Sequence, residues 1–143
     1  MFMKKRVLFL CTANSSRSQM AEGFINHFLG DKMTAFSAGT EATQVNPNAI
    51  EVMKEIGIDI SRQQSKNLSE FDGQKFDYVI TLCGSANETC PLFIGWTKKT
   101  HIGFDDPAQT HGTNDEILRE FRRVRDEINK RLTAFFKEEK ILS

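Results

Sequence analysis

The chain has 143 residues, of which 39% are hydrophobic and twelve are phenylalanine, a composition typical of a globular protein rather than a disordered one. Nineteen basic residues balance nineteen acidic ones, so the formal net charge is zero, which excludes a general nucleic-acid coat. No apolar run approaches the ~20 residues of a membrane span, and the run after the basic start is too short for a signal peptide. We therefore expect a cytoplasmic protein without nucleic-acid or membrane partners.

The first half of the chain is predicted to alternate two strands with two helices. Arg6–Leu10 is nearly continuous in apolar character, as a strand covered on both faces would be. After a short polar loop, apolar residues recur at helical spacing as far as Gly30, a typical C-cap residue. Thr34–Ala38 is the second predicted strand. Asn46–Pro47 has the pattern of an N-cap and a first helical proline, and Gly57 would end the helix that follows.

The second half is less regular. Ile58–Gly73 is polar, and we expect a short helical turn near its end. Tyr78–Leu82 is the third predicted strand, Gly84–Lys99 is predicted to be a loop because proline and glycine interrupt it, and Thr100–Phe104 is the fourth predicted strand. Thr113–Glu116 is a capping-box pattern that opens the last helix. The predicted buried face of that helix consists of Ile117, Phe121, Val124, Ile128, Leu132 and Phe135.

Strands that alternate with helices predict an α/β fold, a three-layer sandwich with a four-stranded parallel sheet flanked by helices. No repeat or linker divides the chain, so we predict one domain over residues 1–143. Ligands bind such sheets beyond the carboxyl ends of the strands. Cys11, Cys83 and Asp105–Pro107 all follow predicted strands at that edge, so we expect them to converge in space. The total of three cysteines is odd, which favours catalytic or redox thiols over structural disulfides in a reducing compartment.

Cys11 and Arg17 are separated by five residues, in the loop between the first strand and the first helix. Such a loop can direct several backbone N–H groups at one point, where a tetrahedral oxyanion can bind. Arg17 can add a two-pronged contact to the anion, and the positive field favours a thiolate at Cys11. An isolated pair at this spacing would more often be a buried cysteine and a surface arginine, but the flanking strand and helix favour the functional interpretation. The predicted anion-binding residues are Thr12, Ala13, Asn14, Ser15, Ser16, Arg17 and Ser18.

The stretch Cys11–Gly23 resembles the phosphate loop of the low-molecular-weight protein tyrosine phosphatases and of the arsenate reductases built on that fold. Three further stretches, Thr81–Cys83, Cys90–Pro91 and Gly103–Ala108, are similar to the thioredoxin-coupled arsenate reductases in particular. The match runs from the first strand to the last helix. Its specific part is the spacing of the three cysteines, because the Cys-x5-Arg pattern marks only the superfamily.

The resemblance implies an arsenate reductase for arsenic detoxification. Cys11 would attack arsenic, and Asp106 would protonate the departing oxygen as general acid. Asp105 would be structural, or would act on Asp106 as a nearby like charge. Cys83 would then displace arsenite by forming a disulfide with Cys11, and Cys90 would take over the disulfide by attacking Cys83. Thioredoxin would reduce the Cys83–Cys90 disulfide. We expect no bound cofactor, a monomer, and a weak phosphatase side activity because the first chemical step is shared.

The chain departs from the family pattern at two positions. Ser16 stands where these reductases usually carry a further cysteine that is not part of the relay, and we expect activity to survive. Potassium-binding members use an asparagine, a glutamate, a serine and an aspartate as ligands. Asn14, Glu22 and Ser37 match the first three, but Lys66 replaces the aspartate. An ammonium group there could take the cation's position and pair with Glu22, so we expect no bound potassium.

Two other classes of function remain open at this stage. A small phosphatase would use only Cys11, Arg17 and Asp106, with water resolving the phosphoenzyme. Tyrosine phosphatases of this fold usually have aromatic residues after the Asp-Pro pair, whereas Ala108 and Gln109 follow it here. A non-catalytic anion-binding regulator is the third possibility, and the complete set of nucleophile, arginine and acid disfavours it.

Overall fold

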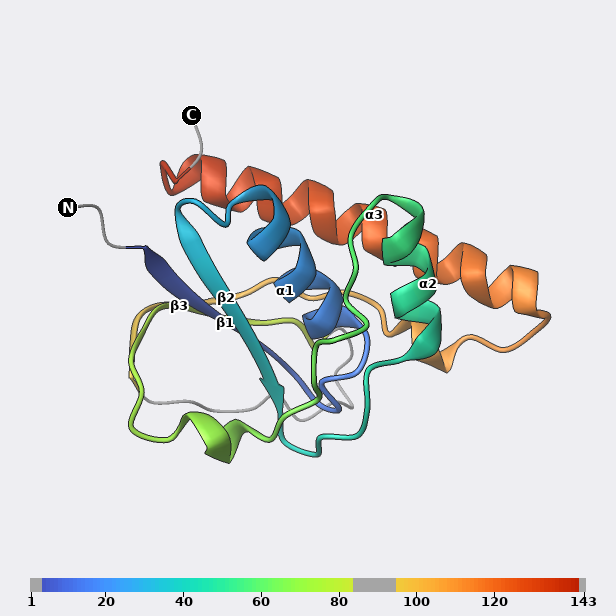
Figure 1. Ribbon diagram of the computed structural model, residues 1–143, viewed down its shortest axis with the longest axis horizontal. Helices are drawn as coiled ribbons and strands as arrows, with labels where there is room; N and C mark the ends of the chain where they lie inside the picture. Colours follow the sequence, from blue (N-terminus) through green and yellow to red (C-terminus); the bar gives the residue numbers. More distant parts are fainter. Residues whose placement is uncertain (1–3, 84–94, 142–143) are drawn as a thin grey trace.

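The computed structural model describes residues 4–83 and 95–141, which build a twisted parallel sheet with helices packed against it (Figure 1). The sheet has the order β2-β1-β3-β4, and each neighbouring pair is parallel. The predicted α/β class with a four-stranded parallel sheet is therefore confirmed. The elements are β1 (Lys5–Cys11), α1 (Arg17–Phe28), β2 (Met33–Gly39), α2 (Pro47–Glu55), η1 (Leu68–Phe71), β3 (Phe76–Thr81), β4 (Trp96–His101), η2 (Pro107–Gln109) and α3 (Asn114–Glu138).

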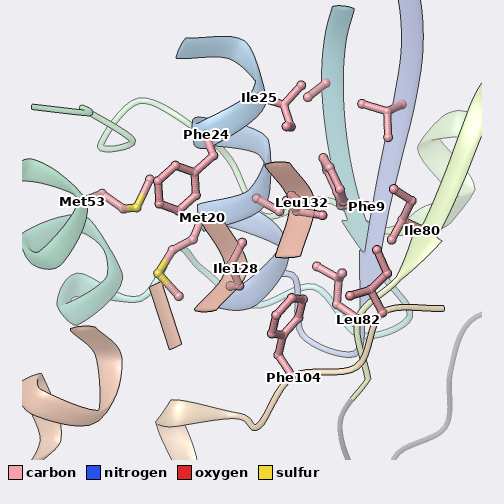
Figure 2. Close-up of a cluster of buried hydrophobic side chains, with 14 of the residues drawn as sticks. Phe9, Met20, Phe24, Ile25, Met53, Ile80, Leu82, Phe104, Ile128 and Leu132 are labelled. Carbon is pink, nitrogen blue, oxygen red and sulfur yellow. The ribbon is translucent and has the colours of Figure 1, made fainter. Parts of the chain in front are cut away.

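The two faces of the sheet are covered unequally. Helices α1, α2 and α3 pack on the face that carries Val7 and Phe9, and their buried side chains form the main core (Figure 2). The opposite face, with Leu8 and Leu10, is covered by the segment around η1, where Phe71 belongs to a smaller cluster. The polar stretch before β3 contributes one short 3-10 turn to this third layer, since it has few apolar residues to bury.

The fourth strand lies earlier in the chain than its predicted position. The sequence predicts this strand at Thr100–Phe104 after a loop over Gly84–Lys99, but β4 covers Trp96–His101. The part of the predicted loop over residues 84–94 lies outside the described residues. It pairs with β3 at the edge of the sheet and is mostly exposed. Its residues are therefore mostly polar, and they lack the apolar pattern by which a strand is predicted. The apolar residues that suggested a strand, Ile102 and Phe104, come after β4 and are buried in the main core.

The helix-start signals were correct. The Asn46 side chain caps α2 by accepting a hydrogen bond from the Asn48 backbone N–H, and the Thr113 capping box is formed at the start of α3. Helix α3 also carries a buried charged residue, Arg125. Arg125 is buried and donates to the backbone oxygen of Val52 at 2.9 Å, which ties α3 to α2. Within residues 4–83 and 95–141, no helix is both long and apolar enough to cross a lipid bilayer.

Candidate active site

The loop between β1 and α1 lies at the carboxyl edge of the sheet, where Cys11 pairs with Gly39 of β2. Its carbonyl oxygens are held by the segment that follows β2. Backbone N–H groups there donate to the oxygens of Thr12, Ala13 and Ser15, at 3.0, 3.2 and 3.0 Å. In a trans peptide the C=O and the next N–H point in opposite directions. Anchoring the carbonyls on the outside therefore turns N–H groups of the loop inward, as an anion site requires.

Asn14 fixes the turn of this loop. It is fully buried and has a positive φ of 48°, a conformation that asparagine tolerates better than most residues. Its side-chain oxygen accepts hydrogen bonds from the Lys66 backbone N–H at 2.8 Å and from Gln19 Nε2 at 3.0 Å. Its Nδ2 donates to Ser18 Oγ at 2.8 Å. These hydrogen bonds stabilise the left-handed backbone conformation of Asn14.

The thiol of Cys11 is buried and lies 2.8 Å from Ser18 Oγ. Ser18 Oγ accepts a hydrogen bond from Asn14 Nδ2 and keeps its own proton, so either Ser18 or Cys11 can be the donor in this contact. The thiolate is the nucleophilic form of cysteine, and a hydroxyl at this position can donate a hydrogen bond to it. Ser18 is predicted as an anion-binding residue, and in the structure its hydroxyl contacts the Cys11 thiol.

Arg17 is the first residue of α1, and its guanidinium is buried beside the Cys11 loop. Nη1 donates to the backbone oxygen of Phe104 at 3.2 Å, and Nη2 lies 3.7 Å from Asp106 Oδ2. The other carboxylate oxygen of Asp106 accepts from the Ala108 backbone N–H at 3.0 Å, because Asp106 is the N-cap of η2. The predicted clamp and the predicted acid therefore face each other across the site.

Two hydroxyls at this loop have no hydrogen-bond partner among the described residues. Thr12 Oγ1 and Ser16 Oγ are both buried and unpaired. A buried polar group without a partner costs free energy, and a bound oxyanion could supply the missing acceptor. Ser16, where the resemblance predicts a further cysteine, therefore lies on the loop that is predicted to bind the anion.

Of the three positions predicted as potassium ligands, Glu22 lies beside the ammonium group of Lys66. Ser37 Oγ donates to Glu22 Oε1 at 2.7 Å, and Lys66 Nζ lies 3.8 Å from the same oxygen. Burial raises the pKa of Glu22, against the opposing effects of the Ser37 hydrogen bond and the Lys66 charge. Asn14 contacts the Lys66 backbone rather than its side chain. Within the described ranges, no group of three or more His, Cys, Asp or Glu side chains could hold a metal ion.

Cys83, the second cysteine of the predicted relay, follows β3. Cys83 is buried, and the preceding residue, Leu82, donates its backbone N–H to Leu10 of β1 at 2.8 Å. This bond brings the chain next to Cys83 alongside the strand that ends in Cys11. Cys90 lies outside the described residues. Of the predicted catalytic residues, Cys11, Arg17 and Asp106 thus gather at one site, with Cys83 following the neighbouring strand.

Three residues of the site were not predicted from the sequence. Gln19 is fully buried and binds both oxygens of Asn14, and Gln63 donates in turn to both oxygens of Gln19. Gly39 lies against the loop so closely that no side chain would fit. No sequence pattern marked Gln19, because the neighbours on its helix face, Glu22 and Gly23, are not apolar, and the packing of Gly39 depends on contacts between distant segments.

A model of the low molecular weight phosphotyrosine protein phosphatase family matches residues 6–141. The chain belongs to this family. A curated relative, the arsenate reductase of Halalkalibacterium halodurans, is 54% identical over 132 residues, which is 92% of this chain and 95% of the relative.

Two solved structures of this family bear on the site. One, described as an arsenate reductase in the phosphate binding state, matches with a TM-score of 0.76 and 34% identity over 95% of this chain and 98% of the other. A thioredoxin-dependent arsenate reductase from Corynebacterium glutamicum matches with a TM-score of 0.58 and 28% identity, over 92% of this chain and 63% of that one.

Proposed function

We propose that this protein reduces arsenate to arsenite, with Cys11 as the nucleophile and a disulfide relay that thioredoxin regenerates. The observation that carries the proposal is the position of the Cys11 thiol, which is hydrogen-bonded to Ser18 in an anion-binding loop that Arg17 and Asp106 adjoin. High identity to curated arsenate reductases over nearly the whole chain supports arsenate as the substrate. The existence of a phosphate-bound relative supports a tetrahedral oxyanion in the loop.

The first step forms a bond between Cys11 and arsenic. The loop N–H groups and Arg17 hold arsenate, and the Cys11 thiolate attacks arsenic(V). Asp106 gives its proton to the departing oxygen, which leaves as water. Arg17 stabilises the negative charge on the remaining oxygens. Arsenic is still in its pentavalent state after this step, so nothing has yet been oxidised or reduced.

The electrons come from the thiols in the second step. The Cys83 thiolate attacks the sulfur of Cys11, the sulfur–arsenic bond breaks, and its electron pair stays on arsenic, which leaves as arsenite. Cys11 and Cys83 are now joined by a disulfide. Cys90 attacks Cys83, which returns Cys11 to its thiolate, and the dithiol of thioredoxin reduces the Cys83–Cys90 disulfide. The two electrons that reduce arsenic thus come finally from thioredoxin, a partner that the Corynebacterium relative supports.

Hydrolysis of phosphate esters is the second candidate function. The family takes its name from phosphotyrosine phosphatases, and ester hydrolysis needs only Cys11, Arg17 and Asp106. We expect it as a weak side activity. The residues after Pro107 favour the reductase, because Ala108 and Gln109 are small or polar and exposed, and offer no aromatic surface to a phosphotyrosine ring.

The Lys66 ammonium serves, in this proposal, as the internal cation at Glu22, in place of potassium. Its distance to Glu22 Oε1, 3.8 Å, and its hydrogen bond to the Gln64 backbone oxygen at 2.8 Å support this assignment. The proposal also retains a single domain over residues 1–143, a monomer without a bound cofactor, and a reducing compartment such as the cytoplasm, where the relay thiols stay reduced at rest.

The proposal is tested by arsenite release in the presence of thioredoxin, thioredoxin reductase and NADPH, beside hydrolysis of a chromogenic phosphate ester. Cys11→Ser should abolish both activities, because a serine hydroxyl without a paired base is a poor nucleophile. Substantial turnover by this variant would remove Cys11 from the mechanism. Wild-type protein that hydrolyses esters but releases no arsenite would favour the phosphatase.

The relay has its own test in Cys90→Ser, given excess arsenate with thioredoxin, thioredoxin reductase and NADPH. This variant should release one equivalent of arsenite and then stop. Peptide mapping should find Cys11 joined to Cys83 in the variant, and Cys83 joined to Cys90 in the oxidised wild type. A variant that turns over repeatedly with thioredoxin would show that Cys90 is not part of the relay.

A further inference from the structure

Helix α3 forms hydrogen bonds with the chain segment that contacts Arg17. The segment is Gly103–Asp106, between β4 and η2. Its Phe104 carbonyl receives the hydrogen bond from Arg17, and its Asp106 carboxylate lies 3.7 Å from the same guanidinium. The orientation of Arg17 therefore depends on where this segment lies.

Arg131 of α3 contacts this segment at two points. Its Nη1 donates to the backbone oxygen of Gly103 at 2.6 Å, and its guanidinium carbon lies 4.8 Å from the centroid of the Phe104 ring. The ring is buried in the main core with Leu82 and Ile128 (Figure 2). A guanidinium over an aromatic face is attractive, and its planar fork can stack and donate at once. Arg131 thus fixes both the peptide and the ring of this segment.

A second arginine of α3 holds the next residues. Arg123 lies 2.9 Å from Asp105 and also pairs with Glu120 and Glu127 on its own helix. The Asp105 side chain is 74% exposed, and exposed ion pairs contribute little. Arg123 is therefore the weaker of the two contacts, and Arg131 is the one that the geometry favours.

We propose that Arg131 is a positioning residue for oxyanion binding: through the Gly103–Phe104 peptide it holds the carbonyl that orients the Arg17 guanidinium toward the anion. Arg131 does not touch the anion in this arrangement. The inference rests on the proposed role of Arg17 in binding oxyanions, and it does not depend on arsenate being reduced. Losing one hydrogen bond of this kind and a cation–π contact should weaken anion binding about five- to tenfold.

The test is the dissociation constant of inorganic phosphate, measured by calorimetry for wild type, Arg131→Met, Arg131→Lys, Arg123→Gln and Arg122→Gln. Methionine retains an apolar side chain but cannot donate, and lysine can still donate to Gly103. Arg122→Gln is the matched control, because it removes a surface pair between α3 and Glu55 that is remote from the segment. Thermal unfolding without phosphate is recorded for each variant to separate loss of stability from loss of affinity.

The proposal predicts a five- to tenfold higher dissociation constant for Arg131→Met, a value within about twofold of wild type for Arg131→Lys, a smaller effect for Arg123→Gln, and no change for Arg122→Gln. Wild-type affinity in a folded Arg131→Met protein would overturn it, as would lysine failing to restore binding. If Arg131→Met does not fold, Arg131→Leu, which also cannot donate a hydrogen bond, takes its place with the same expected rise, and wild-type affinity in folded Arg131→Leu overturns the proposal. Phosphate binding with this pattern in a protein that reduces no arsenate would refute the proposed function while supporting the inference.

Discussion

Replacing Gly39 with alanine should damage the anion site more than it damages the fold. A Cβ at this position would lie 2.4 Å from the Thr12 backbone oxygen and 2.9 Å from both the Asn14 nitrogen and the Cys11 oxygen. All three are backbone atoms of the anion loop, so no flexible side chain can move away. To reach even 3.0 Å from Thr12, the loop must shift by about 0.6 Å (3.0 minus 2.4).

A shift of that size has a predictable cost. Overpacking of this kind typically destabilises a protein by about 1–3 kcal/mol, and a displacement approaching 1 Å can lower catalysis by ~100-fold. We therefore expect Gly39→Ala to bind phosphate at least tenfold more weakly and to lose one to two orders of magnitude in kcat/KM for arsenate. Calorimetric phosphate titration and denaturant unfolding measure the two effects separately.

Gly73→Ala is the matched control for this prediction. Gly73 has a φ of 80°, and its Cβ would meet no heavy atom within 4 Å. Alanine there costs about 1 kcal/mol of backbone strain, yet it should leave phosphate affinity unchanged because Gly73 is remote from the loop. If Gly39→Ala binds phosphate as tightly as wild type, or if both variants lose affinity equally, the close contact of Gly39 with the loop does not control the site.

Three further predictions follow from single contacts. Arg17→Lys should lower kcat/KM for arsenate by ~100-fold or more, because a point charge cannot make the two-pronged contact; near-normal kinetics would show that Arg17 does not face the anion. Potassium should leave the melting temperature and phosphate affinity of the wild type almost unchanged, whereas Lys66→Asp should gain a potassium-dependent rise that sodium does not produce; a potassium-specific rise in the wild type would contradict the lysine assignment. Glu55 has a pKa below its ordinary value of 4.5, chiefly through its hydrogen bond with Arg122, so its contribution to stability should be present above pH 4.5 and be lost as the pH falls through the lowered value. Because this pair is largely exposed, Glu55→Gln should remove less than about 1 kcal/mol in urea unfolding at pH 7 and almost nothing at pH 2.5, and a difference that grows at low pH would refute the assignment.

Local patterns were sufficient to locate the centre of the site. Cys11 and Arg17 lie on one strand–loop–helix unit, whose geometry follows from residues that are neighbours in the sequence. Asp106 could be placed beside them because the carboxyl ends of parallel strands share an edge. The helix caps at Asn46 and Thr113 were predictable for the same reason, since capping depends on residues within one turn.

The remaining features depend on contacts between distant segments. The edge strand β4 is polar because one side of it faces solvent, so the apolar pattern pointed to the residues after it. The tight packing of Gly39 requires the register of β1 and β2, which no local signal contains. Arg131 was one of many charges on α3 until the structure brought it within hydrogen-bonding distance of Gly103.

The central claim is that sulfur, and not water, resolves the adduct on Cys11. It is tested most directly by Cys83→Ser, assayed for arsenite release with thioredoxin, thioredoxin reductase and NADPH, and in parallel for hydrolysis of a phosphate ester. We expect this variant to lose multiple-turnover arsenate reduction while its ester hydrolysis stays close to that of the wild type, because water resolves the phosphoenzyme. Arsenate reduction at the wild-type rate in Cys83→Ser would contradict the relay and make ester hydrolysis the better account of this site.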